Sequence, residues 1–140
     1  MIVYPLAYVT VTIVFVLLDA AWLTVMGPVL YKPALGDILA DKVRLAPAIV
    51  FYLLYPIGIA IFAVLPALRA GSVGHAAVYG ALFGLFAYAT YDLTNAATLR
   101  QWTTQITLAD IAWGAIATGR AATISVVACR AVMTRLDLSL

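Results

Sequence analysis

Long apolar stretches separated by short polar connections dominate the chain. Residues 45–68 contain no charged side chain, and elsewhere single ionisable residues (Asp19, Asp92 and Arg120) interrupt the apolar runs. A helix that crosses a hydrocarbon core about 30 Å thick needs roughly 20 such residues. The pattern therefore predicts four membrane-spanning helices, at about residues 3–26, 46–68, 76–99 and 108–132.

The longest connection, residues 27–44, has a pattern of its own. Gly27-Pro28 is expected to end the first helix. Apolar residues then recur with helical spacing while charged residues take the other flank, which predicts a short amphipathic helix in the membrane interface. The apolar positions are Leu35, Ile38, Leu39 and Val43. This helix is either a simple connector or a lid over a site beneath it.

The composition agrees with a membrane location. Of the 140 residues, 66% are hydrophobic and 10% are charged, whereas a soluble domain carries about a quarter charged residues. The eight lysines and arginines are spread along the chain, with a net charge of +2 and no basic stripe. We therefore exclude a soluble enzyme, a disordered chain and a nucleic-acid binder. The prediction is an all-α integral membrane four-helix bundle, one multi-pass domain over residues 1–140.

The membrane orientation stays open. With four spans, both termini and the loop at 69–75 lie on one side, and the loops at 27–44 and 100–107 lie on the other. Lysines and arginines divide four against three between the two sides. The positive-inside rule does not separate the two orientations at that ratio.

Ionisable residues inside a membrane cost about 2.5–3.5 kcal/mol or more each near the midplane, so their positions are informative. Asp19 and Asp92 each lie about seven residues before the same end of their helices, roughly 10 Å inside it. Asp110 opens the fourth helix at that end, and Tyr52 and Tyr55 enter the second helix at a similar depth. Three carboxyl groups and two phenols from four helices are thus expected to converge in one leaflet.

Helical periodicity adds further side chains to this group. Asp-x-x-Trp occurs twice and places an indole on the same helix face as Asp19 and as Asp110. Gly80 and Gly84 share a stripe with Asp92, and their spacing permits close helix contact, so this stripe is expected to face the interior. The candidate binding residues are Asp19, Trp22, Tyr52, Tyr55, Tyr88, Asp92, Asn95, Asp110, Trp113 and Arg120.

Arg120 lies near the middle of the fourth predicted helix, where a guanidinium group needs a carboxylate or carbonyl groups around it. Asp92 or Asp19 is the natural partner, and such a pair would keep that acid ionised. The pair could equally serve only to lock two helices together. With three acids and one arginine, at least one carboxyl group is left to titrate, bind a cation or act as a general base.

Several kinds of chemistry lack their motifs in this sequence. There is no phosphate-binding loop, GxGxxG motif, histidine-rich set or cysteine pair. Cys129 is interpreted as a packing residue, and three aspartates with one histidine on the opposite side make a poor transition-metal set. We expect no metal, no cofactor and no nucleic-acid partner. Membrane lipid and a small-molecule ligand are the expected partners, with a homo-oligomer if Gly80 and Gly84 face lipid.

The segment YDLTNAATL, residues 91–99, is quite specific, and it is accompanied by residues 18–23, 51–56, Trp102 and 107–114. With these pieces, nearly the entire chain resembles a bacterial membrane family known as domain of unknown function 2177. The resemblance implies a small four-span protein of the bacterial inner membrane. It supplies no activity, cofactor or catalytic residue.

Three functions fit these residues. The first is binding or translocation of a small molecule or lipid headgroup, cationic or hydroxyl-bearing and linked to protonation. The second is an intramembrane lipid-modifying enzyme with Asp19 and Asp92 as general acid and base, which requires the two carboxyl groups to differ in proton affinity. The third is a structural or assembly subunit. Apart from Asp19 and Asp92 in the enzyme alternative, the sequence identifies no catalytic residue.

Overall fold

All regular structure in the described part of the chain is helical. The computed structural model describes residues 2–137, and no strand occurs among them. The elements are α1 (Val3–Met26), η1 (Gly27–Tyr31), α2 (Lys32–Leu35), η2 (Gly36–Ile38), α3 (Leu45–Ile59), η3 (Ala60–Val64), α4 (Leu65–Arg69), α5 (Val73–Thr98) and α6 (Thr104–Arg135). The described residues form four helical segments long and apolar enough to cross a membrane. The predicted all-α membrane bundle is confirmed.

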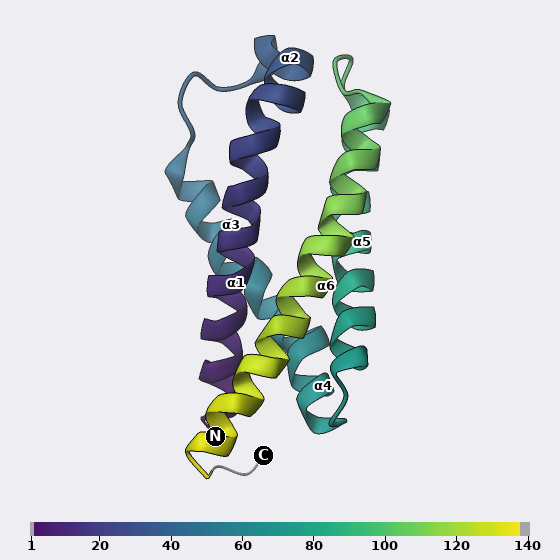
Figure 1. Cartoon of the computed structure of the whole chain (residues 1–140). Coiled ribbons are helices and arrows are strands. Elements are labelled where there is room, and N and C mark those ends of the chain that lie inside the picture. Colours follow the sequence, from purple (N-terminus) through teal and green to yellow (C-terminus); the bar gives the residue numbers. More distant parts are fainter. Residues whose placement is uncertain (1, 138–140) are drawn as a thin grey trace.

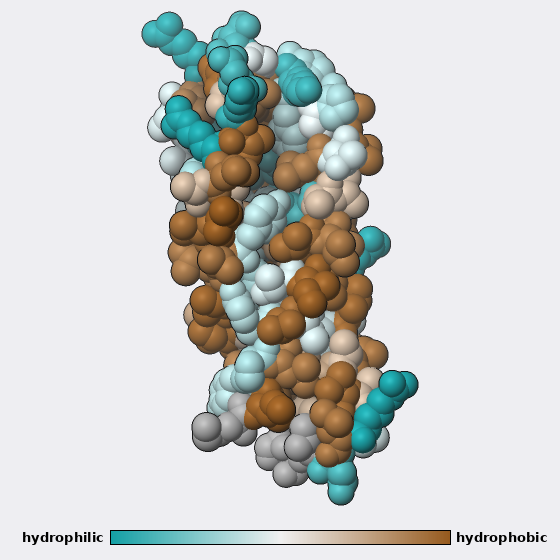
Figure 2. All heavy atoms as spheres, turned by 90° about the vertical axis from the view of Figure 1, so that its left-hand side faces the viewer, coloured by the Kyte–Doolittle hydropathy of each residue, from teal (hydrophilic) through white to brown (hydrophobic). Residues whose placement is uncertain are grey.

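The four segments run up and down along one long axis (Figure 1). The start of α1, the end of α6 and the α4–α5 connection lie at one end, which we call the far end. The near end carries α2 and the α5–α6 connection (Figure 1). On the face shown in Figure 2, most side chains in the middle are hydrophobic, with a paler strip between them, and the strongly hydrophilic side chains gather mainly at the two ends. This is the pattern expected of a protein whose middle lies in hydrocarbon.

Polar caps make α5 and α6 begin earlier than the apolar runs predict. The Ser72 hydroxyl accepts a hydrogen bond from the His75 amide at 3.2 Å, and Thr103 Oγ1 accepts one from the Ile106 amide at 3.2 Å. Each cap satisfies an amide that the first turn of a helix leaves without a partner. The helices therefore start at Val73 and Thr104 rather than near 76 and 108.

The closest helix pair is α5 on α6, and glycines make it close. A Cβ atom added at Gly84 would lie 2.0 Å from the Gly114 carbonyl oxygen, and one at Gly80 would lie 2.8 Å from the Ala122 Cβ. Backbones approach this closely only where the side chain is a hydrogen atom. The expectation that Gly80 and Gly84 face the bundle interior is confirmed.

The second apolar segment changes neighbours along its length. Its near-end part, α3, packs against α1, whereas α5 is contacted by η3 and α4 at the far end. Fully buried side chains, including Phe15, Ile59 and Val64, fill the far half of the bundle. The near half of the bundle therefore opens between α3 and α5, above a closed core.

The prediction for residues 27–44 is partly wrong. Gly27-Pro28 does not end the first helix, because the π-helical turn η1 carries the helix on and the Lys32 amide bonds the Gly27 carbonyl five residues back. This wider turn accommodates a proline that has no N–H to donate. The helical path ends at Ile38, and Val43 lies outside any helix, 77% exposed.

Candidate functional site

A cavity of about 760 Å³ occupies the near half of the bundle. Its walls come from α1, the segment η1–η2, α3, α5 and α6. The lining residues are Asp19, Trp22, Leu23, Tyr31, Leu35, Ile38, Leu39, Phe51, Tyr55, Ala87, Tyr88, Tyr91, Asn95, Leu99, Trp102, Asp110 and Trp113. Side chains that are far apart in the sequence thus share one cavity, which we call the carboxylate pocket.

The pocket contains most of the residues predicted for it. Seven of the ten candidate residues line it, namely Asp19, Trp22, Tyr55, Tyr88, Asn95, Asp110 and Trp113. The other three do not. The Tyr52 hydroxyl donates a hydrogen bond to Asp19, Asp92 is buried beside Asp110, and Arg120 is exposed on the outside of α6.

Asp19 joins three helices. The Tyr52 hydroxyl on α3 donates to Asp19 Oδ2 at 2.6 Å, and Trp113 Nε1 on α6 donates to Asp19 Oδ1 at 3.3 Å. Asp19 as a whole is 6% exposed, and it lines the pocket. Both oxygens have a donor, which is how a buried carboxylate is stabilised.

The two Asp-x-x-Trp segments interlock on the antiparallel helices α1 and α6 (Figure 1). The rings of Trp22 and Trp113 are stacked, with centroids 4.4 Å apart and planes 7° from parallel. Trp113 donates to the acid of the other segment directly, and Trp22 Nε1 donates to the Tyr31 hydroxyl at 2.9 Å. That hydroxyl in turn donates to Asp110. Each indole therefore supports the carboxyl group of the opposite helix.

Asp92 lies deeper than predicted. Its side chain is fully buried, neither carboxyl oxygen has a hydrogen-bond partner, and the carboxyl group of Asp110 is near enough to interact with it. Asp92 was predicted among the binding residues, but Asp110 lines the cavity in its place. Asp92 is on α5, which packs most closely on α6, the helix that carries Asp110.

The predicted ion pair of Arg120 with Asp19 or Asp92 is wrong. Arg120 is exposed, both Asp19 oxygens are bonded to other residues, and both Asp92 oxygens are without a partner. At about 100° per residue, ten residues turn Arg120 roughly 80° away from the direction of Asp110. The preceding residue, Gly119, packs on α5, so the next side chain points outward.

Two residues outside the ten candidates, Tyr31 and Trp102, also line the pocket. Nine residues of regular α-helix would put Tyr31 on the face opposite Trp22, at about 100° per residue. The π-helical turn inserts an extra residue into this register and brings the two side chains into hydrogen-bond contact. In the sequence, the Gly27-Pro28 pair marks the position where the regular helix register is interrupted.

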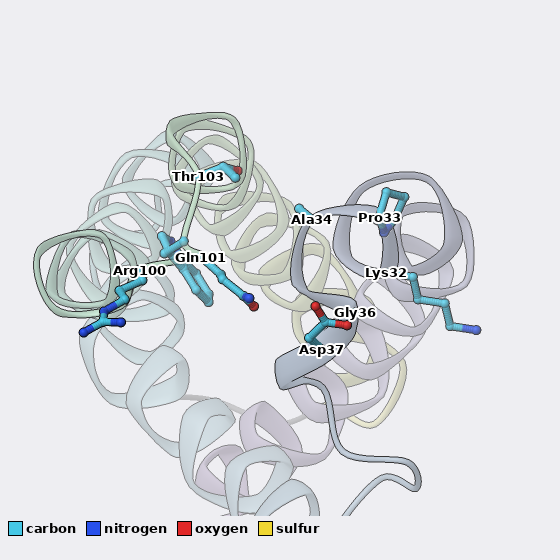
Figure 3. A pocket seen from close by; sticks show the side chains of 9 residues that line it. Lys32, Pro33, Ala34, Gly36, Asp37, Arg100, Gln101 and Thr103 are labelled. Atoms are coloured by element: carbon cyan, nitrogen blue, oxygen red, sulfur yellow. The ribbon is translucent and has the colours of Figure 1, made fainter.

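A second, smaller hollow of about 470 Å³ lies at the near end, between residues 32–37 and 100–103. Asp37 and Gln101 point toward each other across it, whereas Lys32 and Arg100 point away (Figure 3). Trp102 lines both this hollow and the carboxylate pocket. Trp102 therefore belongs both to the aromatic pocket and to this polar hollow, which we call the near-end mouth.

The Tyr31 hydroxyl ties the segment η1–η2 to the pocket, which gives a first prediction. Tyr31→Phe removes a bond to a carboxyl group, worth about 1.5 kcal/mol, so the amides of residues 32–38 should exchange hydrogen about 10-fold faster. Hydrogen exchange read by mass spectrometry measures this. Tyr91→Phe, on another wall of the pocket and 59% exposed, is the control. Equal exchange in both variants would contradict the tether.

The pocket lining combines acidic and aromatic side chains. Within residues 2–137, no set of three or more His, Cys, Asp or Glu side chains is arranged to hold a metal ion. Eight aromatic side chains line the pocket, namely Trp22, Tyr31, Phe51, Tyr55, Tyr88, Tyr91, Trp102 and Trp113. The arrangement offers two carboxyl groups inside an aromatic wall.

Comparison with curated proteins gives no match, and comparison with solved structures gives none either. A family model described as "Predicted membrane protein (DUF2177)" matches residues 4–127. The match covers most of the chain, all of the pocket-lining residues, and all or most of each of the four apolar segments. The chain is therefore a multi-pass integral membrane protein that belongs to the DUF2177 family.

Proposed function

We propose that this protein binds an amphiphilic molecule, a lipid or a smaller amphiphile, whose headgroup is cationic or carries hydroxyl groups. One observation carries the proposal: the carboxyl groups of Asp19 and Asp110 reach the same pocket, and its other walls are mostly apolar. A few convergent polar groups inside an apolar cavity are typical of ligand sites. The headgroup would lie at the carboxyl groups and the chain along the apolar walls.

The outer wall of the pocket supports entry from the membrane. Several lining residues are between 42% and 59% exposed, namely Leu23, Leu39, Tyr91 and Leu99. The wall thus continues onto the hydrophobic outer surface, on the side where α3 and α5 are apart. A hydrocarbon chain in the pocket can extend into the bilayer without crossing a polar surface.

The chemistry of the inner wall selects the headgroup. An ionised carboxyl group only accepts hydrogen bonds, so it favours hydroxyl and ammonium groups over phosphate or carboxylate. The stacked indoles of Trp22 and Trp113 and the ring of Tyr88 add aromatic faces, which attract cations. A headgroup that donates hydrogen bonds or carries positive charge fits both features.

The packing favours binding over the two rival functions and over translocation. The far half is filled by fully buried side chains, so passage across the membrane would require that core to repack. Asp92 does not line the pocket, which leaves the proposed acid–base pair with Asp19 without shared access to a substrate. Gly80 and Gly84 face α6 rather than lipid, which removes the feature that favoured an assembly subunit.

The test compares chain-matched amphiphiles on protein in lipid nanodiscs. Wild type should bind dodecylammonium at least 10-fold more tightly than dodecanoate, and Asp110→Asn should weaken dodecylammonium binding by about 10-fold, the loss of one ion contact of about 1.4 kcal/mol. Asp41→Asn removes a carboxyl group from the exposed stretch after η2 and is the matched control. Equal affinity for the two amphiphiles in all three proteins would overturn the proposal.

A further inference from the structure

We propose that the carboxylate pocket exchanges a proton for its ligand: Asp92 and Asp110 share one proton in the ligand-free protein, and a cationic headgroup at Asp110 displaces it. This inference rests on the proposed function and adds a coupling between ligand binding and proton release. It starts from an arrangement that amphiphile binding alone does not explain, a fully buried carboxyl group without a hydrogen-bond partner.

Burial makes Asp92 an unusual acid. Buried polar groups almost always have a partner, and an isolated buried charge is strongly disfavoured. Neither oxygen of Asp92 has such a partner, and the group near it is another acid, Asp110. Asp110 already accepts one hydrogen bond from Tyr31. Two adjacent carboxyl groups in a buried site do not both ionise unless a cation neutralises one of them.

The surroundings provide no such cation in the described part of the chain. The titratable groups that line the pocket with Asp110 are Asp19 on α1, Tyr31 on η1, Tyr55 on α3, and Tyr88 and Tyr91 on α5, all acids or phenols. Lys32 and Arg100 at the near-end mouth point away from the interior (Figure 3). Charge balance must therefore come from a proton or from the ligand.

The exchange is balanced in atoms and charge. A cation of charge +1 enters the pocket and forms an ion pair with Asp110. The O–H bond of the shared proton breaks, its electron pair stays on the carboxylate, and the proton leaves to water. The net charge of the site is the same before and after. By linkage, the ligand's Kd should then rise 10-fold for each unit that the pH falls, wherever the free site holds the proton.

The test uses dodecyltrimethylammonium, a quaternary cation that has no proton of its own to lose. Titration calorimetry in phosphate and in Tris at one pH gives the number of protons released per ligand bound. Wild type and Asp41→Asn should each release close to one proton. Asp92→Asn is a near-isosteric change that leaves the pocket-lining Asp110 in place, so this variant should still bind but release almost none.

Two outcomes separate this inference from the proposed function. Binding without proton release in wild type, or equal release by wild type and Asp92→Asn, would overturn the exchange and leave amphiphile binding intact. Absence of binding by every chain-matched amphiphile would overturn the proposed function itself. As a second variant, Asp110→Asn should lose both proton release and most of the affinity, so the result does not depend on the folding of one protein.

Discussion

Replacing Gly84 with alanine should destabilise the protein by about 3 kcal/mol, the upper part of the range for overpacking a tight contact. The new Cβ would lie 2.0 Å from the Gly114 carbonyl oxygen and 2.6 Å from Thr118 Oγ1. Backbone cannot yield as a flexible side chain can, so α5 and α6 must move apart. Unfolding by sodium dodecyl sulfate in mixed micelles, followed by tryptophan fluorescence, measures the loss.

The same separation should affect the pocket, because Asp92 and Asp110 sit across the α5–α6 contact. The matched control is Gly27→Ala. An added Cβ at Gly27 meets nothing within 4 Å, and the residue has helical backbone angles. Alanine should therefore be tolerated there or add about 0.5–1 kcal/mol of stability. If both variants unfold alike, the close α5–α6 packing is not present.

Replacing Asp19 with alanine should have the second large effect, again about 3 kcal/mol. The substitution leaves the part-buried Tyr52 hydroxyl and Trp113 indole N–H without their acceptor, and leaving such a donor unsatisfied costs about 1–3 kcal/mol when it is buried. It also removes the contact that joins α1 to α3 and α6 through one side chain. The measurement is the same detergent-induced unfolding.

Asp92→Ala is the comparison for this variant, since the two residues are both buried aspartates. No tyrosine, tryptophan or backbone donor bonds to Asp92, so its removal leaves none of these groups without an acceptor. Asp92→Ala should therefore lose far less stability than Asp19→Ala. Removing the unfavourable interaction between the two carboxyl groups of Asp92 and Asp110 would also offset part of the lost packing. An equal loss for the two aspartates would show that Asp19 does not hold the network described here.

Much of the architecture followed from the sequence, because the cost of charge in hydrocarbon leaves few arrangements. The four spans came from uncharged runs, and the single acids in them had to face inward. Periodicity then placed Trp22 beside Asp19 and Trp113 beside Asp110, and the structure has both pairs in one pocket. Spacing also put Gly80 and Gly84 at the closest helix contact.

The remaining features depend on local geometry that a regular period does not represent. The π-helical turn at Gly27–Tyr31 shifts the helix register, so Tyr31 joins the network with Trp22 and Asp110. Arg120 points in a different direction from Asp110 because the ten residues between these positions do not complete a whole number of helical turns. Asp92 faces inward as expected, but how deep it lies depends on how closely two backbones approach.

The most direct test of the central claim is a structure of the protein in nanodiscs with 12-bromododecyltrimethylammonium. We expect the headgroup in contact with Asp110, inside the cavity that Asp19 also lines, and the bromine signal between α3 and α5 at the membrane-facing opening. Density for this amphiphile only on the outer surface, with the cavity filled by the protein's own side chains, would contradict the account.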